Sequence, residues 1–340
     1  MMSSENVYKN INLNSVAEKA GVSIATVSRV INNNPNVNIE TRIKVEQAIK
    51  ALKYKPNRVA KRLRNKSSSS NLLGVLIPDI QNPFYVEVLR GIEDVAYKNN
   101  YVLIMCNFAQ NEKKQKIYLD ILRSESIDGL IAAPTNENDQ EVISLVKENL
   151  PIVCVDRGLK DVDVDVVLVE NQAGAYSAVD YLAKSGYKRI AYISGLPQIP
   201  SSQQREKGYL EALKANMLKI DKNLIKYGDS RHESGLKLCE ELLNLSNPPD
   251  AIFAGNNLIT LGAIETIHKK GLRIPADIAI IGFDDMYWSN SLNPTLTAVR
   301  QPAYEIGKQA AEQLILRIND PSRPPISMLL KTELMIRNSC

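Results

Sequence analysis

The stretch SVAEKAGVSIATVSRVIN, residues 15–32, decides the fold of the first part of the chain. Apolar side chains recur at helical spacing over residues 13–20, which predicts a short helix. Asn12 or Asn14 can cap its start, because a short polar side chain accepts hydrogen bonds from the free N–H groups of a first turn. Gly21 then supplies a tight turn, so the helix ends just before it.

A second helix follows this glycine. Ser23 can cap it, and Ile24, Val27 and Ile31 share one flank of it while Arg29 lies elsewhere. Two helices joined by a turn of about three or four residues that contains glycine are typical of the helix-turn-helix, whose second helix lies in the major groove of DNA.

A third helix is predicted from about Ile39 to Leu52, with Asn38 as its cap. We expect its apolar positions to close a small core with the first two helices. These positions are Ile39, Ile43, Ala48, Ile49 and Leu52.

Basic residues are concentrated in the same part of the chain. Residues 1–70 contain 13 Lys or Arg and 4 Asp or Glu, a net charge of +9, whereas the whole chain carries +4 and the remainder therefore −5. A compact basic segment predicts a phosphate backbone as its partner. The alternative is a solvated basic tail, but such a tail would lack the apolar periodicity seen here.

The composition as a whole is that of a globular protein. With 340 residues, of which 44% are hydrophobic and 24% charged, the chain can form a small module and a larger two-lobed body. Its four cysteines form no CxxC motif and no secretion signal or membrane span is evident, so we expect a cytoplasmic protein with reduced thiols and no membrane partner. His232 and His268 lie far from any cysteine; we expect both at the surface, and predict no metal site and no cofactor.

Residues 15–32, followed by NVNIETRIKVEQAIKALKYKPNRVAKRL at residues 36–63, resemble the DNA-binding headpiece of the LacI/GalR family of bacterial transcriptional regulators. The resemblance implies that Ile24, Ala25 and Arg29 read base edges. Arg29 can grip guanine with two donors at once, whereas Ile24 and Ala25 can only touch thymine methyl groups or shape the fit. The alternatives are a phosphate contact for Arg29 and a core position for Ile24.

Further DNA contacts are implied at short polar, basic and aromatic side chains, although Ser28 could instead pack inside its helix. They are Ser23, Thr26, Ser28, Asn32, Arg42 and Tyr54.

The run PNRVAKRLR, residues 56–64, matches the hinge helix of the same family. The resemblance implies that Leu63 wedges into the minor groove, with Asn57, Arg58 and Arg62 beside it. The alternative is an amphipathic linker in which Leu63 packs on the same leucine of a second subunit. We expect Ser67–Ser70 to be a short flexible joint.

From Leu72 onward, short apolar runs alternate with amphipathic helical stretches, which predicts parallel sheets with right-handed crossovers. The runs are LLGVLIP, YVLIMCN, GLIAAP, IVCVD, RIAYISG, AIFAGN and IAIIGFDD. Two sheets fit the count, one before and one after about Val169. Polar residues follow the strands, where open parallel sheets bind ligands.

This part resembles the periplasmic-binding-type core of the family, at PDIQNPFY (78–85), VDRG (155–158), SSQQREKGY (201–209) and RIPADIAIIGFDD (273–285). The expected fold is thus an all-α headpiece plus an α/β core of two doubly wound, parallel-sheet lobes. We expect the headpiece at residues 1–55 and the hinge helix and linker at 56–70. The core at 71–340 divides into lobe 1, about 71–169 and 302–327, and lobe 2, about 170–301 and 328–340.

The resemblance implies a cleft that closes on a small effector such as a sugar, a sugar acid, a sugar phosphate or a nucleobase. Phe84 and Tyr85 are expected to wall the pocket, Arg205 to hold a polar or anionic group, and Asp284 to accept from hydroxyl or amino groups. Weaker candidates are Ser201, Asp156 and Asn257.

Each assignment has a structural alternative. Asp156 and Asp284 could be cap or turn residues, and Arg205 could form a salt bridge between the lobes. Phe84 and Tyr85 could be plain core aromatics.

Two departures from the family pattern bear on the ligand. Asn256-Asn257 stand where Asn-Asp is common, which exchanges a carboxylate for an amide that donates as well as accepts. Ser230 stands where many members have an aromatic side chain that stacks on the ligand. The sequence therefore favours a polyol or an acidic sugar over a stacked purine.

The sequence predicts a ligand-responsive repressor that binds a pseudo-palindromic operator as a homodimer. The alternative is a regulator on which a phosphorylated carrier protein docks, for which the segment IGKQAAEQLILRI, residues 306–318, with Lys308 and Arg317, could serve. An enzyme is not expected, because neither GxGxxG nor GxxxxGK[ST] occurs. A periplasmic carrier is not expected either, because the chain lacks a signal segment and has a basic headpiece.

Overall fold

The computed structural model describes residues 11–31, 34–54 and 70–340. It divides into two compact units, Met1–Ser70 and Asn71–Cys340. Each unit is described by itself.

The first unit is a three-helix module of α1 (Leu13–Ala20), α2 (Ile24–Ile31) and α3 (Ile39–Leu52). Asn12 caps α1, because its Oδ1 accepts from the N–H groups of Asn14 at 2.9 Å and Ser15 at 3.2 Å. Gly21 ends α1 with φ 66°, in the left-handed region that glycine adopts without strain. The core is closed by Val16, Ala17, Val27, Val30, Val45, Ala48 and Tyr54.

The core of this module differs from the expectation at two isoleucines of α3. Ile39 and Ile43 are 75% and 47% exposed, while Val45, which we did not expect in the core, is fully buried. The buried face of α3 runs through positions 45, 48, 49 and 52, which is the i, i+3, i+4, i+7 stripe of a helix, and both isoleucines lie off it. In α2, Ile24 is likewise exposed, and Val30 takes the core position.

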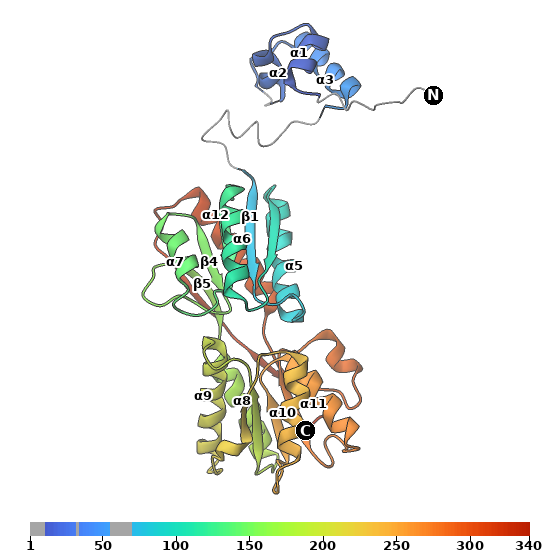
Figure 1. Ribbon diagram of the computed structural model, residues 1–340, viewed down its shortest axis with the longest axis vertical. Coiled ribbons are helices and arrows are strands. Elements are labelled where there is room, and N and C mark those ends of the chain that lie inside the picture. Colours follow the sequence, from blue (N-terminus) through green and yellow to red (C-terminus); the bar gives the residue numbers. More distant parts are fainter. Residues whose placement is uncertain (1–10, 32–33, 55–69) are drawn as a thin grey trace, which may run out of the picture. The chain divides into compact units, whose positions relative to one another are not determined.

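The second unit consists of two lobes, each built on a six-stranded sheet with helices on both faces (Figure 1). The lobe 1 sheet is entirely parallel and has the order β11-β5-β4-β3-β1-β2. Its strands are β1 (Leu72–Ile77), β2 (Val102–Asn107), β3 (Gly129–Ala132), β4 (Ile152–Val155), β5 (Asp165–Val169) and β11 (Ser327–Leu330). Its helices are α5 (Pro83–Lys98), α6 (Glu112–Ser124), α7 (Gln140–Lys147) and α12 (Ala303–Asn319).

Residues along β1 show why both faces of this sheet are covered. Leu73, Val75 and Ile77 belong to the core that α5 and α12 close, whereas Leu72 and Leu76 belong to the core under α6 and α7. Every residue of β1 is buried, as expected of a strand in a sheet covered on both sides.

Lobe 2 repeats the plan with the order β12-β10-β9-β8-β6-β7, in which only β12 is antiparallel among the described pairs. Its strands are β6 (Ile190–Ser194), β7 (Ile225–Tyr227), β8 (Ala251–Ala254), β9 (Ala279–Phe283), β10 (Thr297–Arg300) and β12 (Glu333–Met335). Its helices are α8 (Asn171–Lys184), α9 (Pro200–Ala215), α10 (His232–Leu243) and α11 (Asn257–Lys269).

The chain crosses between the lobes after β5, after β10 and after β11. The last crossing differs from the expected division, which returned the chain to lobe 2 at about residue 328. In the structure, β11 pairs with β5 of lobe 1 and β12 pairs with β10 of lobe 2. The return to lobe 2 therefore falls at residues 331–332 rather than at 328.

Candidate functional site

The outer face of α2 carries the side chains that were expected to read bases. Ser23, Ala25 and Arg29 are exposed, and Ile24 is 44% exposed, so the alternative of a core position for Ile24 does not hold. Val27 and Val30, on the opposite face, anchor the helix to the core. The helix is therefore fixed by one face and free to contact a ligand with the other.

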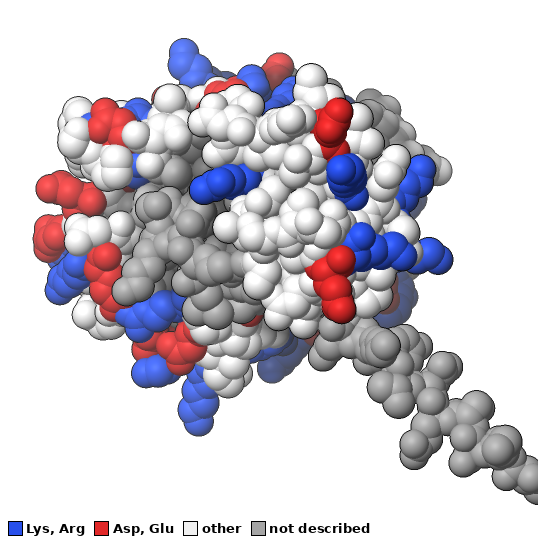
Figure 2. All heavy atoms as spheres, turned by 90° about the horizontal axis from the view of Figure 1, so that it is seen from above, with Lys and Arg blue, Asp and Glu red and all other residues white. Residues whose placement is uncertain are grey.

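The polar residues near the start of α2 also bond to one another. Ser23 Oγ lies 2.9 Å from Thr26 Oγ1 and accepts from the Thr26 main-chain N–H at 3.2 Å. Thr26 and Ser28 are both half-buried. On the face that Figure 2 shows, Lys and Arg side chains are mixed with Asp and Glu rather than gathered in one patch.

Two expected DNA contacts have roles inside the module. Arg42 donates from a terminal guanidinium nitrogen to the main-chain oxygen of Asn34 at 2.8 Å. The Tyr54 side chain is buried in the core, which differs from the surface position that a phosphate contact needs. The expectations for Asn32, for the 56–64 hinge helix and for its residues Asn57, Arg58, Arg62 and Leu63 lie outside the described residues.

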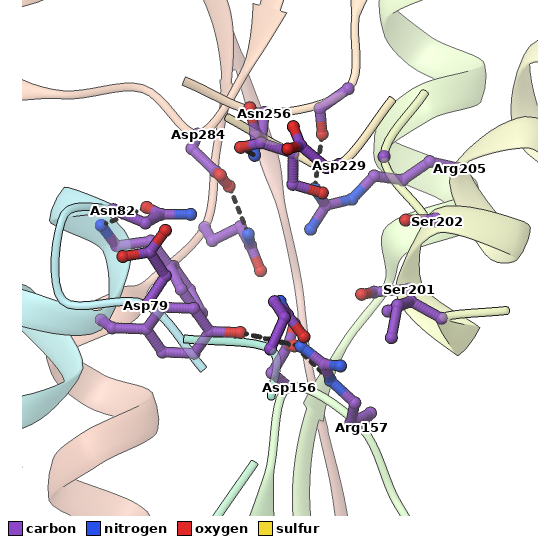
Figure 3. A pocket seen from close by; sticks show the side chains of 18 residues that line it. Asp79, Asn82, Asp156, Arg157, Ser201, Ser202, Arg205, Asp229, Asn256 and Asp284 are labelled. Atoms are coloured by element: carbon purple, nitrogen blue, oxygen red, sulfur yellow. Dashed lines mark hydrogen bonds and ion pairs between the residues drawn. The ribbon is translucent and has the colours of Figure 1, made fainter. Parts of the chain in front are cut away.

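A polar pocket lies between the two lobes, at the carboxyl ends of their strands (Figure 3). It brings together most of the side chains expected to bind an effector, namely Phe84, Tyr85, Asp156, Ser201, Arg205 and Asp284. Asn257 is the expected residue that does not line it. Further lining residues include Asp79, Asn82, Arg157, Asp229, Ser230 and Gln301.

The lobe 1 wall is a buried network of three side chains. Tyr85 Oη donates to Asp156 Oδ2 at 2.9 Å, and Arg157 Nε donates to the same oxygen at 3.0 Å. A terminal nitrogen of Arg157 also reaches Tyr85 Oη at 3.2 Å. Burial, and then the Asp156 charge, raise the pKa of Tyr85 far above its usual range, so its hydroxyl stays protonated.

This network answers the structural alternatives for lobe 1. Asp156 holds a left-handed turn with φ 65°, and its carboxylate is bound to its neighbours, so it is a turn residue that also faces the pocket. Phe84 and Tyr85 pack edge to face, 5.0 Å apart, and are part of the lobe 1 core as well as of the pocket wall.

The lobe 2 wall is built around Arg205 of α9. Its Nε donates to Asn171 Oδ1 at 2.8 Å, and a terminal nitrogen donates to the main-chain oxygen of Gly255 at 2.6 Å. The guanidinium carbon lies 3.8 Å from the centre of the Phe283 ring. None of these groups is a carboxylate, so they give no support to a salt bridge between the lobes.

Asp284 lies in the pocket between Arg205 and the segment that crosses between the lobes after β10. Its carboxylate accepts from the side-chain N–H of Gln301. Burial raises the pKa of Asp284 above its usual range, and the Arg205 charge and the Gln301 hydrogen bond only partly offset this effect. The residue is in the left-handed region, with φ 74°.

Sequence reasoning did not name several side chains that line this pocket, and Arg157 and Gln301 are two of them. Arg157 follows Asp156 directly, and the arginine next to that carboxylate was the available signal. Gln301 left no comparable signal, because it lies in the crossing after β10, which was not predicted as a strand. Its Oε1 is buried and has no hydrogen-bond partner among the described residues, so the pocket offers an unfilled acceptor there.

Within the described ranges, no helix is both long and apolar enough to cross a membrane. The same residues contain no group of three or more His, Cys, Asp or Glu side chains placed to hold a metal ion.

Comparison with known proteins agrees with both parts of the architecture. Residues 12–57 match the model of the bacterial regulatory proteins of the lacI family, and residues 179–340 match a periplasmic binding protein-like domain. The chain is 38% identical to catabolite control protein A of Priestia megaterium, over 91% of this chain and 93% of that protein.

Solved structures show the same likeness. The lac repressor dimer bound to operator and an anti-inducer aligns with a TM-score of 0.83 at 27% identity, over 97% of this chain and 98% of that one. A complex of the transcriptional regulator CelR with cellobiose aligns with a TM-score of 0.74 at 29% identity, over 97% and 100%. The helix-turn-helix module, the two-lobed core and these matches together show that the chain belongs to the lacI family of bacterial regulatory proteins.

Proposed function

We propose that this protein is a transcriptional repressor that binds a pseudo-palindromic operator as a homodimer and is controlled by a neutral, sugar-like metabolite in the cleft. The observation that carries the proposal is the polar pocket enclosed by both lobes, in a chain that also presents an exposed α2 face. A ligand that touches both lobes favours one lobe arrangement, which is what a switch requires.

The charges of the pocket favour a neutral ligand. Four carboxylates line it, from Asp79, Asp156, Asp229 and Asp284, against the two guanidinium groups of Arg157 and Arg205. Arg157 is bound to Asp156, and Arg205 already donates to two protein oxygens. A sugar acid or a sugar phosphate would enter an excess of negative charge. Carboxylate and amide acceptors suit ligand hydroxyls instead, so the geometry argues against the acidic sugar that the sequence allowed.

A homodimer is supported by apolar side chains that the single chain leaves uncovered on lobe 1. Val102 and Met105 on the edge strand β2 are 47% and 39% exposed, and Tyr97 of α5 is 78% exposed. Exposed apolar side chains that cluster on neighbouring elements are typical of subunit contacts. Light scattering in dilute solution should give the mass of two chains, and a mass of one or four chains would contradict this part of the proposal.

A docked phosphocarrier protein is less well supported by the residues that suggested it. Arg317 is held by the buried carboxylate of Asp165 at 3.0 Å and is only 14% exposed. Lys308 pairs with Glu305 at 3.3 Å, and the apolar face of α12 is buried in lobe 1. Arg317 is therefore engaged within lobe 1, and Lys308 alone, 38% exposed, offers little for a phosphorylated partner.

A thermal-shift screen followed by a DNA-binding assay tests the proposal. Neutral mono- and disaccharides, sugar acids, sugar phosphates and nucleobases would be compared for their effect on Tm. Each hit would then be added to the protein on a DNA site selected from a random pool. We expect hits among neutral sugars, and a change in DNA affinity with each hit. Hits confined to anionic ligands would refute the charge argument, and a hit that leaves DNA affinity unchanged would refute its role as the effector.

A further inference from the structure

A single hydrogen bond between two side-chain amides joins the lobes beside the pocket. Asn257 Nδ2, at the start of α11 in lobe 2, donates to Asn82 Oδ1 of lobe 1 at 2.9 Å. Both residues are buried, with exposed fractions of 1% and 9%. A buried polar contact of this kind costs free energy when one of its partners is lost.

The direction of this hydrogen bond is fixed by the backbone of α5. Asn82 caps that helix, and its Oδ1 also accepts from the main-chain N–H of Phe84 at 2.9 Å. The amide of Asn82 therefore cannot be turned around without loss of the cap. The group that faces it from lobe 2 must be a donor, which an asparagine supplies and an aspartate does not.

Asn257 also contacts the pocket through its backbone. Its main-chain N–H acts to lower the pKa of the Asp284 carboxyl, so the same residue faces a pocket acid of lobe 2 and bonds the helix cap of lobe 1. Its Oδ1 has no hydrogen-bond partner among the described residues. Within the part of the chain that the structure describes, the bond to Asn82 is therefore the only hydrogen bond of the Asn257 side chain.

We infer that Asn257 is a positioning residue of the cleft, whose side-chain amide holds lobe 2 to lobe 1 in the arrangement seen here by donating to Asn82. Any rotation of the lobes that widens the pocket breaks this bond. The pair thus contributes to the free-energy difference between the two lobe arrangements before a ligand is present, beside apolar contacts such as that of Met286 with the lobe 1 core. This inference concerns the empty protein and holds whichever ligand the cleft accepts.

Two single substitutions test the role of the Asn257 Nδ2 donor, because they add the same charge but only one of them removes the donor. Asn257→Asp removes the donor and leaves two acceptors facing each other. Asn82→Asp keeps an acceptor for both Phe84 N–H and Asn257 Nδ2, and aspartate is an equally good helix cap. The two variants add the same charge at nearly the same place. A carboxylate in the first turn of α11 is also favourable to that helix, so Asn257→Asp is expected to fold.

The readout is the distance between the lobes in the ligand-free, full-length protein. Spin labels would be placed at the exposed positions of Lys113→Cys on α6 and Glu233→Cys on α10. Cys340→Ser removes the half-buried thiol, while Cys106, Cys154 and Cys239 are buried. Doubly labelled protein would be mixed with an excess of unlabelled protein, and distances measured by double electron–electron resonance.

We expect Asn257→Asp to raise the ratio of long to short inter-lobe distances about tenfold, and Asn82→Asp to leave the distribution as in the unsubstituted protein. If Asn257→Asp does not fold, Asn82→Ser replaces it, because serine still caps α5 but is too short to reach Asn257. It should open the lobes in the same way. An unchanged distribution in the donor-lacking or shortened variant would overturn the inference, as would equal opening in Asn82→Asp.

Discussion

Gly91 of α5 and Gly307 of α12 each lie against the backbone of the other helix. A Cβ atom added to Gly91 would overlap the main-chain oxygen of Tyr304, and one added to Gly307 would overlap the main-chain oxygen of Val88. The two helices therefore meet backbone to backbone. Because α5 begins at the pocket with Phe84 and Tyr85, this contact also sets the position of the lobe 1 wall.

Gly307→Ala should destabilise the protein although alanine is the better helix former. The substitution gains up to about 1 kcal/mol in helix propensity, but the overlap forces α12 away from α5, and such overpacking costs about 1 to 3 kcal/mol or more. Urea unfolding followed by circular dichroism would measure the difference. Gly158→Ala is the matched control, since a Cβ there would meet only Val166 at 3.5 Å, an ordinary contact. Equal midpoints for both variants would contradict the close-packing argument.

Arg157→Ala should strongly lower the free energy of unfolding, although Arg157 lines a pocket. It leaves the buried Asp156 carboxylate without its ion partner, and breaking one side of a buried pair costs about 3 to 5 kcal/mol. The free energy of unfolding in urea measures this loss. Arg90→Ala removes the exposed Arg90–Glu87 pair and should have little effect. If both substitutions had the same small effect, Asp156 would not depend on Arg157.

Local signals in the sequence located most elements of the fold. The caps Asn12 and Asn38, the turn at Gly21 and the apolar strand runs each depend on a few neighbouring residues, and the structure has them where they were expected. The exposed positions of Ile39 and Ile43 could not be read in this way. Which side of a short helix becomes buried depends on the helices packed against it, and composition alone does not give their directions.

Residues of the candidate site could be predicted where they stand in a family motif. They could not be predicted where tertiary contacts determine which side chains meet. Arg205 and Asp284 stand in recognisable motifs and do face each other in the pocket. Gln301 reaches Asp284 only because the chain crosses between the lobes at that point. Asn257 was expected in the pocket, but its side chain turns to Asn82 instead, since a cap acceptor of lobe 1 lies within reach.

Arg29→Ala should reduce discrimination between the selected DNA site and random DNA. A bidentate contact to guanine is worth about 1 to 3 kcal/mol of discrimination, and the exposed position of Arg29 on α2 allows it. Fluorescence anisotropy with both DNAs at several salt concentrations would measure the effect. Lys50→Ala, on the third helix, is a control for loss of one positive charge. An equal loss of affinity on both DNAs would reduce Arg29 to a phosphate contact.

Asp284 and Asp285 are adjacent in sequence, but removal of the charge should change the stability of the protein in opposite directions at the two positions. Burial raises the pKa of Asp284, with the Arg205 charge and the Gln301 hydrogen bond acting against it. A carboxyl whose pKa is higher in the folded chain contributes full stability below its unfolded pKa of about 3.9. That contribution is lost as the pH rises through the folded pKa. Asp284→Asn should therefore stabilise the protein at pH 7 and have no such effect at pH 3, while weakening ligand binding.

Asp285 is the matched control with the opposite sign. Burial raises the pKa of its carboxyl, but hydrogen bonds from Arg337, Arg300 and Ser289 outweigh burial and lower the pKa overall. Its stabilising contribution is present above the unfolded pKa and is lost as the pH falls through the folded pKa. Asp285→Asn should thus lower the urea midpoint at pH 7, and less so at low pH. Both variants would be unfolded in urea from pH 3 to pH 8. A lower midpoint for Asp284→Asn at pH 7 would show that its charge is stabilised by Arg205 more strongly than burial opposes it.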